Sequence, residues 1–438
     1  MVTPQKTFAL GLQHVLAMYA GAVIVPLIIG AALQLTPSQM AYLIAADLFT
    51  CGIATLLQVL GTRYVGIKMP VVLGCTFTAV GPIIAISLSS NLATAYGAII
   101  VAGLFVFLAA PLFGKLLRFF PTVVTGSVVT IIGLSLIPVA MNNAAGGQGA
   151  PDFGQPRNLL LALGTLLLIL VINRFFTGFI RSISVLLGLI AGTILASFLG
   201  MVNFSTVSEA SWVSIVQPFY FGTPEFNIVA ILTMILVCLI SMVESTGVYF
   251  ALGKITDKKI GQNDIVKGLR AEGIGIVLGG IFNAFPYTAY SQNVGLVSMT
   301  RIKSRSVIIA AGLLLIVLGL LPKLAALTTV IPNPVLGGAM VAMFGMVVAS
   351  GINILSDVDF TRNENLLIAA CSIAVGLGSA AVPQMFDQLP TMLKMLLQNG
   401  IVTGSVTAIA LNIFLNMKGD SAKNSASTPL VTEANASH

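Results

Sequence analysis

The chain has 438 residues, of which 57% are hydrophobic and only 8% are charged, whereas about 25% of the residues in soluble domains are charged. This composition excludes an ordinary water-soluble fold and predicts a protein whose solvent is the lipid bilayer. The net charge of +7 does not indicate a nucleic-acid partner, because the basic residues lie in short loops between apolar segments rather than on one basic face.

The first apolar segment begins almost at once. Residues 1–6 lead directly into a mostly apolar stretch of about 25 residues, which is longer than the core of a signal peptide. We therefore interpret this stretch as the first membrane span.

Further apolar windows follow along the chain, and each is near the roughly 20 residues that a helix needs to cross the hydrocarbon core. Fourteen windows begin near residues 8, 41, 69, 94, 120, 158, 181, 226, 267, 286, 305, 334, 365 and 400. If both termini are cytoplasmic, all 21 Lys and Arg residues except Arg157, Lys323 and Lys394 fall on the cytoplasmic side, as the positive-inside rule requires. We expect an all-α polytopic protein of the bacterial inner membrane with fourteen spans. Residues 418–438 are rich in Ser, Ala, Asn and Thr and are expected to form a disordered cytoplasmic tail.

The two halves of the chain resemble each other. The residues from Ile99 to Leu104 are echoed by those from Ile308 to Leu313, and Pro121–Gly126 is echoed by Pro332–Gly337, two residues out of step. The segments that begin near residues 70 and 286 are both short, led by proline and interrupted by glycine. Because seven spans is an odd number, a duplicated half must insert upside down, which predicts 7+7 inverted repeats with the substrate site at the two interrupted segments.

Four ionisable side chains lie within the predicted spans: His14, Asp47, Glu244 and Glu272. Burial of such a group in a membrane costs several kcal/mol, so each is a functional candidate. Alternatives remain for each of them, and Glu244 could have a hydrogen-bonded structural role. Glu272 could form a surface ion pair with Arg270, Asp47 could face water, and His14 could be a hydrogen-bonded core histidine.

The cysteines give no indication of metal or redox chemistry. Cys51, Cys75, Cys238 and Cys371 all lie within apolar spans, far apart and without CxxC spacing. We interpret them as small buried residues rather than metal ligands or disulfides, and no cofactor is expected.

The most polar stretch within the spans runs from Pro286 to Arg301. Such a stretch cannot face lipid, because its amide groups would lose their hydrogen bonds. It is therefore expected to line a cavity. The side chains of Gln292 and Asn293 offer a donor and an acceptor together, which suits the edge of a heterocycle that carries N–H and C=O side by side.

This stretch resembles the signature of the nucleobase-ascorbate transporter family, in which Gln, Glu or Pro precedes Asn, Gly, Thr and a final Arg, Lys or Gly at fixed spacing. Gln292, Asn293, Gly295, Thr300 and Arg301 fill every fixed position. The resemblance extends to Gln13-His14, to the segment 74–78 and to Glu244, and it is greatest to the bacterial xanthine permeases. Gln at position 292 is similar to purine carriers, whereas uracil carriers have Glu there.

The resemblance implies a homodimer in which a core domain slides against a gate domain. The core would comprise residues 1–119 and 226–322, and the gate residues 120–225 and 323–417. Spans three and ten would each contain a short strand, and the two strands would meet at the substrate.

The implied function is import of a purine nucleobase, preferably xanthine, by proton symport. A uracil or urate carrier and sodium coupling remain alternatives. An anion exchanger or channel of the same fold would predict a basic site, whereas these spans carry acids. A membrane enzyme would need a paired acid and base or metal ligands, and the chain has only two histidines.

The resemblance also implies the site residues. Glu244 would accept hydrogen bonds from ring N–H groups and Gln292 would pair with a neighbouring edge. Phe77 and Ser291 would contribute their backbones, with the Phe77 ring also covering one face of the base. Asn293 and Thr78 complete the expected substrate contacts.

Proton coupling is the least determined part of the expected site. In many relatives an ionisable or polar residue lies one helical turn after the eighth-span Glu, but Val248 occupies that place here. The proton would then fall to Glu244, Glu272 or His14. Glu272 is the preferred coupling residue, because burial disfavours the charged form of a carboxyl group and Glu244 is assigned to the substrate.

Overall fold

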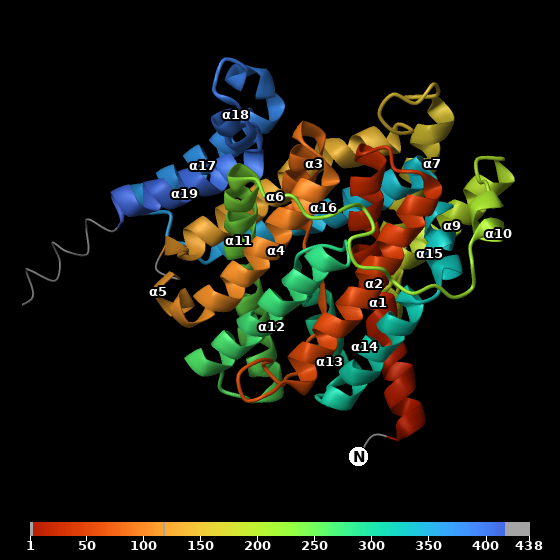
Figure 1. Ribbon diagram of the computed structural model, residues 1–438, viewed down its shortest axis with the longest axis horizontal. Coiled ribbons are helices and arrows are strands. Elements are labelled where there is room, and N and C mark those ends of the chain that lie inside the picture. Colours follow the sequence, from red (N-terminus) through yellow and green to blue (C-terminus); the bar gives the residue numbers. More distant parts are fainter. Residues whose placement is uncertain (1–2, 117–118, 417–438) are drawn as a thin grey trace, which may run out of the picture.

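A computed structural model describes residues 3–116 and 119–416, so the expected tail at 418–438 lies outside the described residues. The fold is almost entirely helical (Figure 1). Its elements are α1 (Pro4–Ala32), α2 (Pro37–Leu60), β1 (Leu73–Cys75), η1 (Phe77–Ala79), α3 (Val80–Ser89), α4 (Leu92–Ala109), η2 (Ala110–Leu112), α5 (Phe113–Leu116), α6 (Thr122–Ala144), α7 (Pro156–Phe175), α8 (Gly178–Ser182), α9 (Ser184–Phe198), α10 (Ser205–Glu209), α11 (Ile228–Thr256), α12 (Gln262–Ile281), β2 (Tyr287–Ala289), α13 (Ser291–Thr300), α14 (Arg305–Gly319), α15 (Pro322–Thr329), α16 (Asn333–Ser356), α17 (Asn363–Ala381), η4 (Pro383–Phe386), α18 (Thr391–Gln398) and α19 (Gly400–Leu415).

Several long helices begin at a side chain that caps their free backbone N–H groups. Thr36 and Gln39 form a capping box at the start of α2, in which each side chain accepts a hydrogen bond from the other residue's backbone N–H. The side chains of Asn91, Asn227 and Asn399 cap α4, α11 and α19, because each accepts hydrogen bonds from backbone N–H groups in the first turn of its helix. Because uncapped N–H groups are costly in an apolar environment, these residues fix where the apolar helices begin.

A helix or a strand–helix segment begins within a few residues of each of the fourteen predicted starts. Among the described residues, eight helices are long and apolar enough to cross a membrane, and α14 with α15, bent by 79°, would form a ninth. The remaining apolar segments, Phe77–Ser89, α9 and α19, are shorter. The chain is therefore a multi-pass membrane protein, while the full number of fourteen spans remains a prediction.

The two segments that the sequence interprets as interrupted helices each contain a short strand followed by a half-helix. β1 precedes η1 and α3, and β2 precedes α13. The strands pair antiparallel, with Leu73 opposite Ala289, Gly74 opposite Thr288 and Cys75 opposite Tyr287. The prediction of short strands that meet is confirmed.

Helices from the two halves pack in corresponding pairs. α4 packs on α12, and its sequence counterpart α14 packs on α2. The glycine shared by the two echoed motifs lies at a close backbone contact in each pair. A Cβ on Gly103 would lie 2.9 Å from the Gly273 carbonyl oxygen, and the Gly312 carbonyl oxygen would lie 2.6 Å from a Cβ on Gly52. Small residues that allow such backbone contact are typical of helix pairs in membranes, and this pairing is the pattern expected of an internal repeat.

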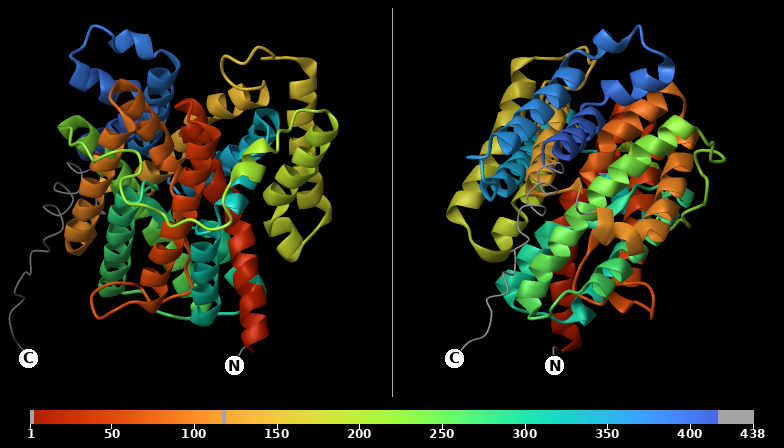
Figure 2. Two further views of the ribbon diagram at one scale, coloured as in Figure 1. Left: turned by 45° about the vertical axis from the view of Figure 1, so that its right-hand side comes forward. Right: turned by 90° about the vertical axis from the view of Figure 1, so that its left-hand side faces the viewer.

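The helices form two packing groups. One contains α1, α2, α4, α11, α12 and α14 around the strand pair; the other contains α6, α7, α9, α16, α17 and α19. In the second group α6 packs on α16, with α7 and α9 on one side and α17 and α19 on the other (Figure 2). The strand pair therefore belongs to the first group, and its half-helices border the second.

Three loops, at residues 61–69, 257–261 and 301–304, lie at the end of the molecule where α1 begins (Figure 1), and each carries basic residues. The Gly66 amide donates to the Lys267 carbonyl oxygen over 2.7 Å, and the Lys258 ammonium lies 3.4 Å from the Ile67 carbonyl oxygen. The Lys303 ammonium forms an ion pair with Asp257. Three loops that are distant in sequence thus form one positively charged end.

The cysteine prediction holds for three of the four residues. Cys51, Cys75 and Cys238 are buried, but Cys371 is exposed. The prediction that all four are buried is wrong for Cys371, because it lies on a face of α17 that the other described residues leave exposed.

Candidate substrate site beside the strand pair

The strand pair and two half-helices define the centre of the candidate site. The pairing extends beyond the strands, because the Thr76 amide donates to the Pro286 carbonyl oxygen over 2.9 Å and the Tyr290 amide to the Val72 carbonyl oxygen over 3.0 Å. η1 and α13 begin directly after these residues. The N-terminus of a helix carries a partial positive charge and free N–H groups, so two such ends lie beside one strand pair.

Gly74 lets this arrangement close. A Cβ at this position would lie 2.5 Å from the Tyr290 ring, a distance that real side chains do not adopt. The Tyr290 hydroxyl in turn donates to the Cys75 carbonyl oxygen over 2.8 Å. The ring therefore packs across the strand at a position where only glycine fits.

Helix α11 docks on the strands through two serines. The Ser245 and Thr288 hydroxyl oxygens lie 2.8 Å apart, and Ser245 also accepts a hydrogen bond from the Ala289 amide at 3.0 Å. The Ser241 hydroxyl, one turn earlier, donates to Thr76 over 3.5 Å. Both serines are buried, whereas Glu244 between them is exposed.

The predicted substrate residues divide into accessible and buried ones. Ser291 and Gln292, in the first turn of α13, are exposed, and Phe77 on η1 is half-buried with its ring 5.8 Å from that of Phe344 in an edge-on contact. Thr78 and Asn293 are buried. Because α11 contacts η1, β2 and α13, the elements that carry Glu244, Phe77 and Gln292 converge on the strand pair.

His14 connects α1 to the signature segment. Its side chain is 4% exposed. The Asn293 amide nitrogen lies 3.0 Å from His14 Nδ1 and donates to the His14 carbonyl oxygen over 3.1 Å. This favours the interpretation of His14 as a hydrogen-bonded core histidine that orients Asn293.

Glu272 is buried, with 1% exposure, and accepts a hydrogen bond from the Tyr249 hydroxyl. The alternative of a surface ion pair with Arg270 is wrong. In the described part of the chain Glu272 forms no ion pair, and the Arg270 guanidinium lies over the Phe107 ring at 5.6 Å.

Two features of the site went beyond the sequence prediction. Tyr249 had no sequence signal, although it lies one turn after Ser245 and holds Glu272. The sequence predicts Asp47 as a functional candidate, but the alternative that it faces water is wrong. Asp47 is fully buried, and its Oδ1 lies 3.1 Å from the Tyr287 hydroxyl of β2.

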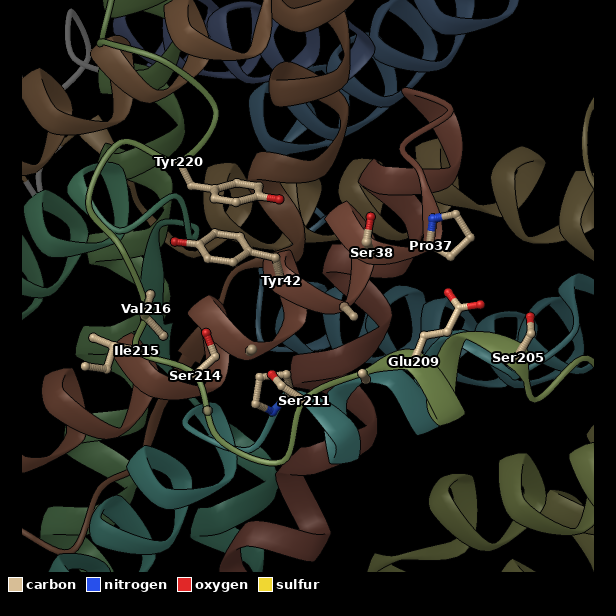
Figure 3. A pocket seen from close by; sticks show the side chains of 15 residues that line it. Pro37, Ser38, Tyr42, Ser205, Glu209, Ser211, Ser214, Ile215, Val216 and Tyr220 are labelled. Atoms are coloured by element: carbon tan, nitrogen blue, oxygen red, sulfur yellow. The ribbon is translucent and has the colours of Figure 1, made fainter.

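A separate cavity of about 610 Å³ lies at the opposite end of the molecule from the basic loops, between the start of α2, α10 and the segment 210–220 (Figure 3). Tyr42 stacks on Tyr220 there with ring centroids 3.8 Å apart. Glu209 and the hydroxyls of Ser38, Ser205, Ser211 and Ser214 line it. It contains none of the predicted substrate residues.

The fold and the site together define a class of protein: a multi-pass membrane protein whose accessible polar groups surround a strand pair between half-helices. The fold is similar to that of solved structures. The transmembrane domain of the cyanobacterial bicarbonate transporter BicA superposes with a TM-score of 0.64 at 17% identity, over 92% of this chain and 97% of that one; at this identity the likeness shows the fold alone.

Residues 5–385 match the model of the permease family that contains the xanthine and uric acid permeases, and the chain belongs to this nucleobase-ascorbate transporter family. It is 58% identical to the xanthine permease of Bacillus subtilis, over 94% of both chains. It is 59% identical to the uric acid permease PucK of the same organism, over 93% of this chain and 95% of that one. These relatives are permeases, not enzymes.

Proposed function

We propose that the protein imports a purine nucleobase, preferably xanthine, across the bacterial inner membrane by proton symport. The observation that carries this proposal is the pair of exposed side chains, Glu244 on α11 and Gln292 on α13, beside a strand pair whose own polar side chains, Tyr287 and Thr288, are buried. Costly polar groups that stay accessible within apolar spans are expected to contact a polar substrate.

The chemistry of the site fits the edge of a purine. The Glu244 carboxylate accepts hydrogen bonds from ring N–H groups, and the Gln292 amide pairs with an adjacent N–H and C=O. The backbone N–H groups at the start of η1 and α13 suit a carbonyl oxygen, and the Phe77 ring covers one face of the base. Asn293 and Thr78 shape the site from behind.

Transport follows from relative motion of two bodies. We propose that residues 1–119 and 226–322 form the core domain and residues 120–225 and 323–417 the gate domain, a division that the two packing groups support. We propose that these are built as 7+7 inverted repeats of fourteen spans, that the core slides along the gate in a homodimer, and that the basic end and both termini face the cytoplasm.

Urate is the second candidate substrate, favoured by the similarity to a uric acid permease. Urate and xanthine differ at one ring position, so the contacts of Gln292 and Glu244 do not separate them. Sodium coupling, uracil transport and anion exchange are less supported alternatives.

Competition measurements test the proposal. Cells that lack their own purine carriers and express this protein are expected to accumulate labelled xanthine, with unlabelled xanthine and urate competing better than uracil. A proton uncoupler should abolish accumulation. Uptake that persists with the uncoupler and follows sodium, or competition led by uracil, would contradict the proposal.

A further inference from the structure

Asp47 is a buried carboxyl group that the proposed substrate contacts do not use. It lies on α2 with 0% exposure. The Tyr287 hydroxyl lies 3.1 Å from its Oδ1 and 3.2 Å from its carbonyl oxygen, so it donates to one of them. In the part of the chain that the structure describes, Oδ2 is buried and has no hydrogen-bond partner.

Within residues 3–116 and 119–416, no positive charge compensates this carboxyl group. The ionisable groups that face it are Cys51 on α2, Cys75 on β1, Tyr96 on α4, and Tyr287 and Tyr290 at β2; all of them are neutral near neutral pH. The charged or basic side chains on helices packed against α2 lie elsewhere. His14 contacts Asn293, Glu272 accepts from Tyr249, Arg270 lies over Phe107, Arg305 faces the Val59 carbonyl oxygen, Lys323 lies over Trp212 and Asp264 pairs with Lys258. Lys6 is exposed in the first turn of α1, and Lys267 lies half-buried in the second turn of α12.

A carboxylate in such surroundings would be costly. Burial of an unpaired ion costs several kcal/mol even after relaxation, and hydrogen bonds from the neutral Tyr287 hydroxyl and the neutral, weakly donating Cys75 thiol do not offset this. A carboxylic acid avoids the cost, because the proton removes the charge.

The group is connected directly to the strand pair. Tyr287 is the residue of β2 that pairs with Cys75 of β1. The next residue, Thr288, contacts Ser245 of α11, the neighbour of Glu244. A change in charge at Asp47 alters the strength of the bond from Tyr287 and therefore acts on the strands that bear the substrate site.

We propose that Asp47 is a second proton-binding site, separate from Glu272, and that its protonation state controls substrate affinity through Tyr287 and β2. The proton is bound from water and returned to water, with no other group consumed. The control of affinity rests on the proposed purine transport, whereas the binding of the proton does not.

Infrared spectroscopy of the purified protein tests proton binding. A protonated carboxylic acid absorbs separately from a carboxylate, so Asp47→Asn is expected to remove one such band near neutral pH. The exposed Asp357→Asn serves as the control and should remove none. A spectrum of Asp47→Asn that retains every carboxylic acid band overturns the proposal, whether or not the protein binds a purine.

Equilibrium binding of labelled xanthine across a pH series tests the link to the site. Asp47→Asn should lose one ionisation from the pH profile of the dissociation constant, and Tyr287→Phe should shift that ionisation and the infrared band of Asp47 without removing either. If the pH profile of the dissociation constant is unchanged in Asp47→Asn, the proposal is overturned. If Asp47→Asn does not fold, an unchanged infrared band of Asp47 in Tyr287→Phe overturns it. If the wild type binds no purine at all, the proposed function fails while the infrared result still decides proton binding.

Discussion

Gln292 lies in the first turn of α13 with its side chain accessible, while its neighbour Asn293 is buried against His14. Gln292→Ala is expected to weaken xanthine binding about tenfold or more, because two hydrogen bonds of about 1 kcal/mol each are lost. Gln292→Glu should shift preference among nucleobases, since it removes the donor and keeps the acceptor. Equilibrium binding checks both variants, with the exposed Gln384→Ala on η4 as the control. Wild-type affinity in Gln292→Ala, at normal amounts in the membrane, would refute the contact.

Phe77 is half-buried at the border between the two packing groups, with its ring edge-on to Phe344. If the ring covers one face of the base, Phe77→Ala should weaken binding about 2- to 10-fold, since aromatic contacts add about 0.5 to 1.5 kcal/mol beyond area burial. Phe250→Ala, at an exposed position of α11, should leave the dissociation constant unchanged. Equal affinities for the two variants would mean that Phe77 is ordinary packing.

Glu272 is held by Tyr249 in a buried position without a cationic partner among the described residues. A gradient drives uptake only if some group binds the proton in one state and releases it in another. Glu272→Gln is therefore expected to abolish proton-driven accumulation while equilibrium binding of xanthine remains measurable. Glu364→Gln, at a half-buried position at the start of α17 where Glu364 pairs with Arg362, is the matched control. Normal accumulation by Glu272→Gln would exclude this role.

At the residue scale the sequence identified which side chains are unusual but not their partners. Asp47 and Glu272 are candidates because acids are costly in apolar spans. The sequence leaves water as a possible partner of Asp47 and Arg270 as a possible partner of Glu272. In the structure Tyr287 lies beside Asp47 and Tyr249 beside Glu272. Tyr249 itself could not have been predicted, since a tyrosine in an apolar helix is compatible with any buried position.

At the element scale the strand pair requires Gly74, where a Cβ would meet the Tyr290 ring at 2.5 Å. Gly74→Ala should force the ring or the strand to move, at a cost of about 1 to 3 kcal/mol, and should lower both the melting temperature and xanthine binding. Gly164→Ala on α7, where nothing lies within 4 Å of the added Cβ, should change neither. Thermal unfolding of the solubilised protein checks this. A melting temperature for Gly74→Ala equal to that of Gly164→Ala would show that the close packing is not required.

The two interrupted segments were predictable because proline and glycine break the apolar period, and polar backbone at membrane depth must be buried in protein. The register of the strands was not, since it depends on contacts with α11 such as that between Ser245 and Thr288. The bend between α14 and α15 was also missed, because the window that begins at residue 305 is apolar on both sides of the break at Leu320.

At the scale of the whole molecule the segment between α9 and α11 is attached to the first packing group. The backbone N–H of Gln217 donates to the Tyr42 hydroxyl over 3.1 Å, and that hydroxyl donates to the backbone carbonyl oxygen of Gln217 over 2.6 Å. The Phe219 backbone N–H donates to the Ile281 carbonyl oxygen over 2.9 Å. Although this segment falls within the proposed gate at 120–225, these bonds attach it to the first packing group. If the core slides along the gate, the segment should therefore move with the core and bend near Gly200, which has a positive φ of 69°.

The most direct test of the account uses purified protein reconstituted into liposomes, with an inward proton gradient as the only driving force. If purine import is coupled to protons, labelled xanthine should accumulate above its external concentration in sodium-free buffer. Dissipating the proton gradient should release it. Glu244→Ala should abolish accumulation. Equilibration without accumulation, or accumulation only when a sodium gradient is supplied, would contradict proton-coupled purine import.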